Sequence, residues 1–311
     1  MTNGSAQRVG FCHEAFFYGD SDEFLTGTVP FIEEGVAAGE TVLVVVPEPR
    51  LRLLRGTLGA AGDEVDFLPM EKVGRNPARL VSACGDLLRG NDAERGIRGV
   101  GEPIFTGRSA PELDECERHE RLLNIAFGED PALTLMCPYD TNALDDEVLA
   151  QAERSHPYCS GPQGRSTSER FAPGNPLAGS LPKREVPAAT LGFGKSDLRT
   201  VRRAVTDLAH SAGLSPRRNE DLVLAVCEVA TNSIQHGGGG GLLAIWRDGG
   251  QLVCDIHDFG CIEDPLVGRE RVPTGQGGGR GLWIANQLCD LVQIRSGEKG
   301  TYVRLRMGID R

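Results

Sequence analysis

Short apolar runs and amphipathic stretches alternate along the first half of this 311-residue chain. The runs have the length of strands, and the stretches between them repeat apolar residues at helical spacing. We expect strands at 11–18, 41–46, 65–70, 97–102 and 133–138, and helices at 22–38, 49–58, 77–88, 111–127 and 145–155. Strands separated by helices predict a parallel sheet covered on both faces. Ligands of such sheets bind where strands end, here near His13, Glu14, Glu102 and Asp140.

A long amphipathic helix is expected at 216–236, where Gly237 ends it. Glu228 and Asn232 lie one turn apart on a side of this helix with few large apolar groups. The carbonyl oxygen of Asn232 is a ligand of the kind that Mg²⁺ prefers, and Glu228 stays near the same pocket. The helix therefore offers a candidate site for a divalent cation.

The pattern at 251–258 alternates as a half-buried strand, with Asp258 on its inward face. A carboxylate there is costly unless a donor meets it, and the exocyclic amine of adenine would be such a donor. Gly260 lets a base approach the backbone closely. A glycine-rich run at 275–281 precedes another helix, whose unpaired first-turn amides attract phosphate oxygens. Together these features predict a nucleotide site.

The second half resembles the GHKL ATP-binding fold of histidine kinases and gyrase, and most closely the anti-sigma-factor serine kinases of that family. The resemblance covers roughly residues 187–311 and is specific as a set of motifs. It implies a Bergerat-type α/β sandwich. The motifs are, in order, Glu228-x-x-x-Asn232, Asp258-x-Gly260, Gly279-x-Gly281-Leu282 and Gly300-Thr301.

The resemblance implies a role for each motif residue in binding ATP and Mg²⁺. Asn232 would ligate Mg²⁺, and Asp258 would bind the adenine amine. The other nucleotide contacts would come from Gly260, Gly277, Gly279, Gly281, Leu282 and Thr301. In the serine-kinase branch, Glu228 would accept the proton of the substrate hydroxyl during phosphoryl transfer.

The second half also departs from the family pattern. A run of glycines at 237–241 directly follows the long helix, and the lid between Cys261 and Gly275 is short. No His-centred phosphoacceptor helix precedes the ATP module, which disfavours a two-component histidine kinase. His236 and His257 stay outside the predicted site, because His236 ends a helix and His257 points away from the inward face. The short lid favours the compact serine-kinase branch and leaves phosphotransfer open.

The first half resembles the MEDS sensory domain of prokaryotic regulators over roughly residues 7–160. The resemblance rests on the run that begins at His13, the Gly-Glu-Thr-Val-Leu-Val-Val segment at 39–45, and Cys137-Pro-Tyr-Asp with the later His156-Pro157. It implies a RecA-like parallel α/β fold used for sensing, in which His13 is a candidate signal contact. The sequence contains no Gly-x-x-x-x-Gly-Lys-[Ser/Thr] motif, so we do not expect a second ATPase.

Residues 161–186 are rich in turn formers and poor in periodicity, which predicts a flexible linker. We therefore expect a sensory domain at 1–160, a linker at 161–186 and an ATP-binding domain at 187–311. The polar linker would let the two domains reorient.

A net charge of −11 disfavours direct binding to nucleic acid and favours protein partners. The sequence has neither an apolar run long enough to span a bilayer nor a secretory signal, which predicts a cytoplasmic protein without membrane contact. Its nine cysteines are scattered without a Cys-x-x-Cys pair, as expected of reduced core thiols. Cys12-His13 and His119 make only a weak case for zinc.

These patterns and resemblances predict a signalling switch in which the first domain senses an unknown signal and biases an ATP-binding module. The output would be binding of a sigma factor, phosphorylation of a serine on an antagonist protein, or both. A partner-binding switch without catalysis stays open, as does a less favoured sensor kinase that phosphorylates its own histidine. The serine-kinase resemblance also implies a possible homodimer.

Overall fold

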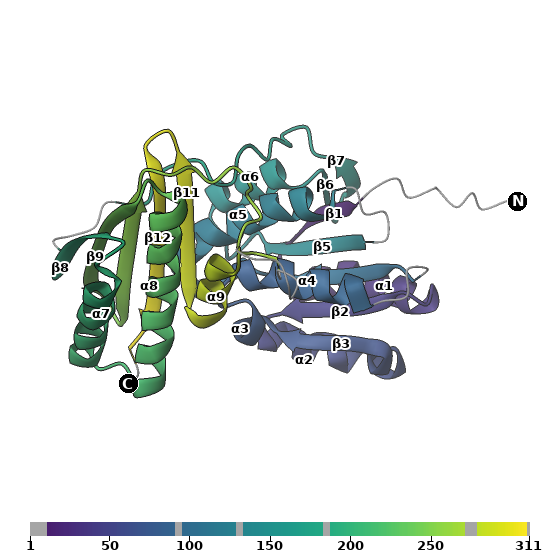
Figure 1. Cartoon of the computed structure of the whole chain (residues 1–311). Helices are drawn as coiled ribbons and strands as arrows, with labels where there is room; N and C mark the ends of the chain where they lie inside the picture. The colour runs from purple at the N-terminus through teal and green to yellow at the C-terminus, as the bar shows by residue number, and fades with distance from the viewer. Residues whose placement is uncertain (1–10, 91–94, 129–132, 183–186, 271–278, 310–311) are drawn as a thin grey trace, which may run out of the picture. The chain divides into compact units, whose positions relative to one another are not determined.

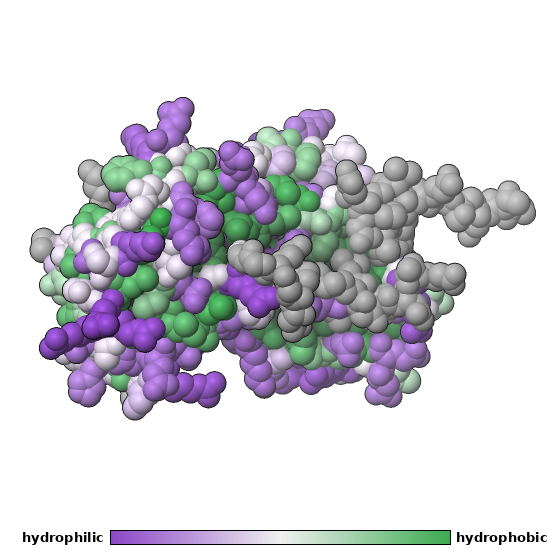
Figure 2. Space-filling model, viewed as in Figure 1, coloured by the Kyte–Doolittle hydropathy of each residue, from purple (hydrophilic) through white to green (hydrophobic). Residues whose placement is uncertain are grey.

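The computed structural model describes residues 11–90, 95–128, 133–182, 187–270 and 279–309. The chain divides into two compact units, one formed by residues 1–77 and 83–174 and the other by residues 78–82 and 175–311. Figure 2 shows hydrophilic residues over much of the visible surface, with apolar residues interspersed among them. Within the described ranges, no helix has both the length and the apolar sequence needed to cross a bilayer.

The first unit is a seven-stranded sheet with helices between its strands (Figure 1). The strands are β1 (Cys12–Tyr18), β2 (Thr41–Val46), β3 (Val65–Pro69), β4 (Ile97–Gly101), β5 (Leu133–Asp140), β6 (Tyr158–Gly161) and β7 (Gly164–Thr167). The helices are α1 (Ser21–Ala37), α2 (Glu48–Leu58), α3 (Met70–Val73), α4 (Ala78–Gly90), α5 (Ala110–Phe127) and α6 (Asp146–Ser155), with a 3-10 turn at Gly59–Glu64.

The strand order is β3-β2-β4-β5-β1-β6-β7, and every pair is parallel except β6 with β7. The expected parallel α/β architecture is therefore confirmed. On one face of this sheet, Phe16 and Val44 pack with Phe24 of α1 in an apolar core that α2 also joins. His13 lies on the opposite face, where Glu120 of α5 contacts it. Both faces are thus covered by helices, as the sequence pattern predicts.

The segment 161–186, expected as a linker, is structured in part. Gly161 of β6 pairs with Gly164 of β7 across a two-residue turn, and Gly164 adopts a φ of +103°. Farther along, Leu177 is buried in the core of the second unit. The turn-forming residues at the start of this segment therefore form a hairpin, whereas their composition alone predicts a linker.

The second unit is an antiparallel sheet of five strands with three helices. The strands are β8 (Ala189–Gly194), β9 (Gly240–Asp248), β10 (Gln251–Asp258), β11 (Leu291–Gly297) and β12 (Gly300–Gly308), in the order β11-β12-β10-β9-β8. The helices are α7 (Leu198–Ala212), α8 (Pro216–His236) and α9 (Arg280–Leu288). All three helices contribute to one apolar core with the inward residues of the sheet.

Strand β10 shows why only one face of this sheet needs helices. Cys254 and Ile256 face the core, as the alternation predicts. On the other face, Asp255 forms an ion pair with Arg304 of β12, with 2.8 Å between Oδ2 and Nη2. Asp258 lies on the same face of β10 as Cys254 and Ile256 and is only 7% exposed. The strand thus brings a carboxylate to the inner edge of the core.

Candidate functional site

A cavity of about 320 Å³ opens in the second unit between α8, the start of α9, the end of β10 and the start of β12. Its volume falls at the lower end of the range for small-molecule sites. Six residues of the predicted nucleotide site line it: Asn232, Asp258, Gly260, Gly279, Leu282 and Thr301. The same cavity is lined by His236, which the sequence reasoning left out, and by Ser233, Glu263 and Asp264, which it did not identify.

Asp258 is held in place by two donors from its own unit. Its Oδ2 accepts a hydrogen bond from Ser233 Oγ at 2.6 Å, and its Oδ1 accepts one from Gly260 N at 2.9 Å. Each carboxylate oxygen has two lone pairs, so the group retains capacity for a further donor. A buried carboxylate with spare acceptor capacity at a cavity wall can therefore recognise an amine of a ligand.

The loop after β10 is fixed against β12 by a chain of hydroxyl groups. Thr301 Oγ1 donates to Gly260 O at 2.9 Å and lies 2.8 Å from Ser296 Oγ. Ser296 Oγ in turn accepts from Ile262 N at 2.8 Å. Thr301 therefore supports the cavity wall from within the protein, a contact that the sequence motif did not reveal.

Glycines surround Asp258 because larger residues would collide with its supports. A Cβ on Gly237 would lie 2.4 Å from Asp258 Cγ, and one on Gly260 would lie 2.7 Å from His236 O. Gly300 has a φ of +98°, and a Cβ there would lie 2.0 Å from Asp258 O. Gly260 therefore lets the loop after β10 approach the end of α8 closely. The sequence had explained this glycine only by the approach of a base.

Glu228 and Asn232 meet the start of α9 through Gly281. A Cβ on Gly281 would lie 3.0 Å from both Glu228 Oε2 and Asn232 Nδ2. Asn232 lines the cavity, whereas Glu228 lies beside it, one turn earlier on the half-buried side of α8. The structure therefore brings together the two residues that the sequence paired and adds Gly281 as their contact.

The N-terminus of α9 lies at this cavity, which Gly279 and Leu282 line. Its N-cap, Gly279, has a φ of +79° and no side chain that could bond the first-turn amides. Such a helix start attracts anions such as phosphate. Gly277, which the resemblance also assigns to the phosphate contact, lies outside the described residues.

The cavity residues fit a nucleotide with a divalent cation. The buried carboxylate of Asp258 suits an amine, the α9 start suits phosphate, and the Asn232 carbonyl is a hard oxygen ligand suited to Mg²⁺. His257 takes no part, because its ring stacks on Tyr302 with 4.0 Å between centroids. The arrangement can hold an adenine at one end and charged oxygens at the other.

In the first unit, three strand ends bring polar groups to one edge of the sheet. Tyr18 ends β1, Asp140 ends β5 and Glu102 follows β4 directly. Tyr18 Oη donates to Glu102 Oε1 at 2.8 Å, and Arg50 of α2 pairs with Asp140 at 3.1 Å. Burial raises the pKa of Glu102 to about 8. This edge is the one at which ligands bind in parallel sheets.

His13 and Glu14 do not lie at that edge, contrary to the prediction. Both are near the start of β1, whose end is formed by Tyr18. Glu14 instead pairs with Ser160 and Arg165, which tie β1 to the β6–β7 hairpin. A strand has two ends, and only the carboxyl ends of parallel strands gather at the ligand edge.

Comparisons with known proteins assign each unit to a family. The model of the MEDS family, the methanogen/methylotroph DcmR sensory domain, matches residues 12–157. The model of the histidine kinase-like ATPase domain matches residues 194–307. These matches confirm the sensory and GHKL-type domains that the motifs predict. A comparison with curated proteins gives no match.

A comparison with solved structures gives matches to part of this chain, two of which follow. The crystal structure of the RsbU and RsbW domains of Rv1364c from Mycobacterium tuberculosis is 22% identical over 42% of this chain and 35% of that one, with a TM-score of 0.30. The histidine kinase AdeS of Acinetobacter baumannii is 11% identical over 40% of this chain and 70% of that one, with a TM-score of 0.23. This chain thus spans about a third of the Mycobacterium structure.

Proposed function

We propose that this chain, which joins a MEDS sensory domain to a histidine kinase-like ATPase domain, is a cytoplasmic regulator that binds ATP with Mg²⁺. In this proposal it acts as an anti-sigma factor and phosphorylates a serine of an antagonist protein. The observation that carries the proposal is the buried Asp258 carboxylate, held by Ser233 and Gly260 at the wall of a cavity that Asn232 and Gly279 also line.

Each part of the cavity would serve one part of the nucleotide. Asp258 would accept a hydrogen bond from the adenine amine, and Thr301 would keep the adjoining wall in place. The first-turn amides of α9 would bind phosphate oxygens, and Asn232 would ligate the cation. Mg²⁺ supplies charge neutralisation at the phosphates. Binding in this order would place the terminal phosphoryl group toward Glu228 and its neighbour Gly281.

Glu228 would act as the base for the protein substrate. Its carboxylate accepts the proton of a serine hydroxyl while the serine oxygen bonds to the terminal phosphorus and the bond from that phosphorus to the leaving oxygen of ADP breaks. Gly281 supports this role, because the absence of a side chain there lets α9 approach Glu228 Oε2 closely. The partners would be a sigma factor and its antagonist, and the MEDS domain would control the output in response to its signal.

Transfer of labelled phosphate from ATP to candidate antagonist proteins tests the catalytic part. We expect Glu228→Gln to abolish the label on the partner while ATP binding persists. Glu220→Gln, which removes an exposed carboxylate from the same helix, should transfer as the wild type does. Equal transfer by both variants would contradict the role of Glu228.

A second candidate function is a partner-binding switch without catalysis. It is favoured by one observation, because Glu228 lies beside the cavity and does not line it. This function predicts ATP-dependent capture of the partner with no transfer by the wild type. A sensor kinase of the histidine type would instead put an acid-labile phosphate on this chain, so acid and base treatment of any labelled chain separates it from both.

A further inference from the structure

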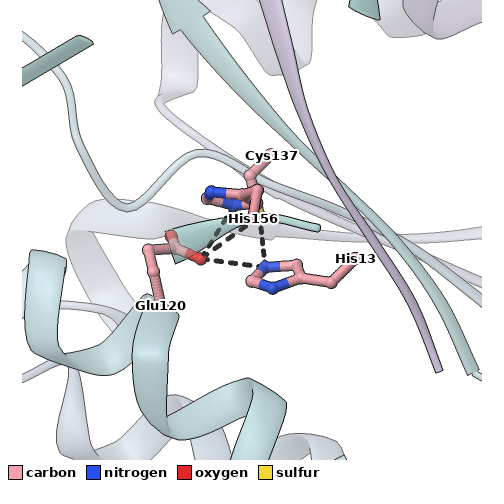
Figure 3. A group of neighbouring side chains, drawn as sticks. All are labelled: His13, Glu120, Cys137 and His156. Atoms are coloured by element: carbon pink, nitrogen blue, oxygen red, sulfur yellow. Dashed lines mark hydrogen bonds and ion pairs between the residues drawn. The ribbon is translucent and has the colours of Figure 1, made fainter. Parts of the chain in front are cut away.

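Four side chains with metal-binding atoms converge inside the first unit (Figure 3). His13 comes from β1, Cys137 from β5, Glu120 from α5, and His156 directly follows α6. One ligand atom of each lies within 4.8 Å of the others, and all four residues are buried. We call these residues the four-residue cluster. They belong to neither the nucleotide cavity nor the edge formed by Tyr18, Glu102 and Asp140.

The distances within the cluster approach those of a tetrahedral metal site. Glu120 Oε2 lies 3.1 Å from His13 Nε2, 3.4 Å from His156 Nε2 and 3.5 Å from Cys137 Sγ. Cys137 Sγ lies 3.4 Å from His13 Nε2. Tetrahedral zinc, with nitrogen at about 2.0 Å and sulfur at about 2.3 Å, separates its ligand atoms by roughly 3.3 to 3.6 Å. Small adjustments would therefore suffice to surround an ion.

Hydrogen bonds fix the tautomers of both imidazole rings. His13 Nδ1 lies 3.1 Å from Asn124 Oδ1, and the amide of Asn124 is oriented because its Nδ2 donates to two backbone carbonyls. His156 Nδ1 lies 2.8 Å from Ala152 O. Both oxygens only accept, so Nδ1 carries the proton in each ring. In a neutral ring with this tautomer, Nε2 presents a lone pair to the centre of the cluster, as in metal-binding histidines.

This arrangement leaves acceptors facing one another. Two imidazole lone pairs point at a carboxylate, and the single thiol proton of Cys137 can satisfy only one of these contacts. Within the described part of the chain, Glu120 Oε1 and His156 Nε2 have no hydrogen-bond partner. A divalent cation at the centre would satisfy all four ligand atoms, and the carboxylate and a thiolate would balance its charge.

We propose that the four-residue cluster binds a tetrahedrally coordinated transition-metal ion, and that Zn²⁺ is the ion. Two imidazole nitrogens, one thiolate and one carboxylate oxygen form a ligand set that suits zinc. Binding releases the thiol proton of Cys137 to solvent and forms the sulfur–zinc bond. With four protein ligands the site is closed, so the ion ties β1, β5, α5 and the segment after α6 together.

The test uses the untagged full-length protein. We expect about one equivalent of zinc by elemental mass spectrometry, and a cobalt-substituted form with tetrahedral visible bands and a thiolate charge-transfer band. Cys137→Ser should lose the charge-transfer band and weaken zinc binding about a hundredfold or more in chelator competition. Cys116→Ser is the matched control, because Cys116 is also a buried thiol but donates to Pro103 O at 3.3 Å. It should bind zinc as the wild type does.

A second variant and a second measurement keep the proposal open to refutation. Asn124→Leu removes the acceptor for His13 Nδ1 and should weaken zinc binding about 10- to 100-fold while the tetrahedral cobalt spectrum persists. X-ray absorption of the wild-type zinc protein should show one sulfur and three nitrogen or oxygen neighbours. Folded wild-type protein that neither contains nor takes up zinc, equal losses in both cysteine variants, or a first shell without sulfur would overturn the site.

Discussion

Replacing Asp258 by asparagine tests the base-recognition half of the proposed nucleotide site without emptying the cavity wall. The asparagine Oδ1 can still accept from Gly260 N, which lies 2.9 Å from Oδ1 of the aspartate. Its amide nitrogen then faces Ser233 Oγ, and the serine hydroxyl can turn to Val229 O, which lies 3.2 Å away. The internal hydrogen bonds are therefore largely preserved, and we expect a loss of about 1 kcal/mol in the free energy of unfolding.

The expected loss of binding free energy for ATP is larger than this loss of stability, and it is specific to adenine. The variant removes the charged acceptor for the exocyclic amine, and a hydrogen bond to a charged group contributes about 1.5 to 3 kcal/mol. That range corresponds to a roughly 10- to 150-fold increase in the Kd for ATP. Inosine triphosphate carries a carbonyl in place of the amine, so it gains nothing from Asp258. Its Kd should be weak in the wild type and should change little or improve in the variant.

Calorimetric titration of both nucleotides in Mg²⁺ therefore gives the decisive quantity, which is the ratio of the two Kd values. Asp248→Asn is the matched control, because Asp248 is half-exposed at the end of β9 and pairs with Arg306 at 2.8 Å. It removes the same charge away from the cavity and should keep the wild-type ratio. A ratio that Asp258→Asn leaves unchanged would refute the assignment of Asp258 to the adenine amine.

Two further predictions address the phosphate end of the cavity and the edge of the MEDS sheet. Gly281→Ala places a Cβ 3.0 Å from Glu228 Oε2 and Asn232 Nδ2. Such overpacking costs about 1 to 3 kcal/mol. It should raise the Kd for ATP about tenfold or more in the same titration. Burial raises the pKa of Glu102 from 4.5 to about 8. Between these pH values the folded chain keeps a proton that the unfolded chain loses. The free energy of unfolding should therefore fall as the pH rises through this range. Urea unfolding at stepped pH should show that the free energy of unfolding falls by up to about 1.4 kcal/mol per pH unit in the wild type. Glu102→Gln should remove this pH dependence. The same pH dependence in the variant would contradict the burial argument.

The hydrophobic pattern predicted β1 to β5 and the five longer helices of the first unit, and α8, β10 and α9 of the second, because each of these elements has one dominant local period. The strand at Thr41–Val46 matches its prediction at both ends, and α5 was expected at 111–127 and begins one residue earlier. The β6–β7 hairpin escaped because its four-residue strands are too short and polar to show a period. Composition alone cannot separate turn formers that join two paired strands from turn formers that join two domains.

The sequence pattern predicted which faces of α8 and β10 carry the residues of the proposed nucleotide site, but it did not predict the tertiary contacts that support them. Asn232 and Asp258 follow from helix and strand periodicity, and the structure places both on one cavity. Ser233 and Ser296 carry no sequence signal, because their partners lie 25 and 34 residues away along the chain. The supports of a binding group are set by packing, which a single sequence does not reveal.

The four-residue cluster shows the same limit in its strongest form. The sequence suggested Cys12 as the thiol beside His13, yet neighbouring residues of a strand point to opposite faces. Cys12 Sγ accordingly accepts from Arg165 Nη2 at 3.0 Å, away from the imidazole. The parallel register aligns Ala15, which shares the face of His13, with Cys137 of β5, and so delivers that distant thiol to the imidazole. Strand pairing therefore brings His13 and Cys137 together, and α5 and the segment after α6 add Glu120 and His156, which explains why spacing along the chain gave only a weak case for zinc.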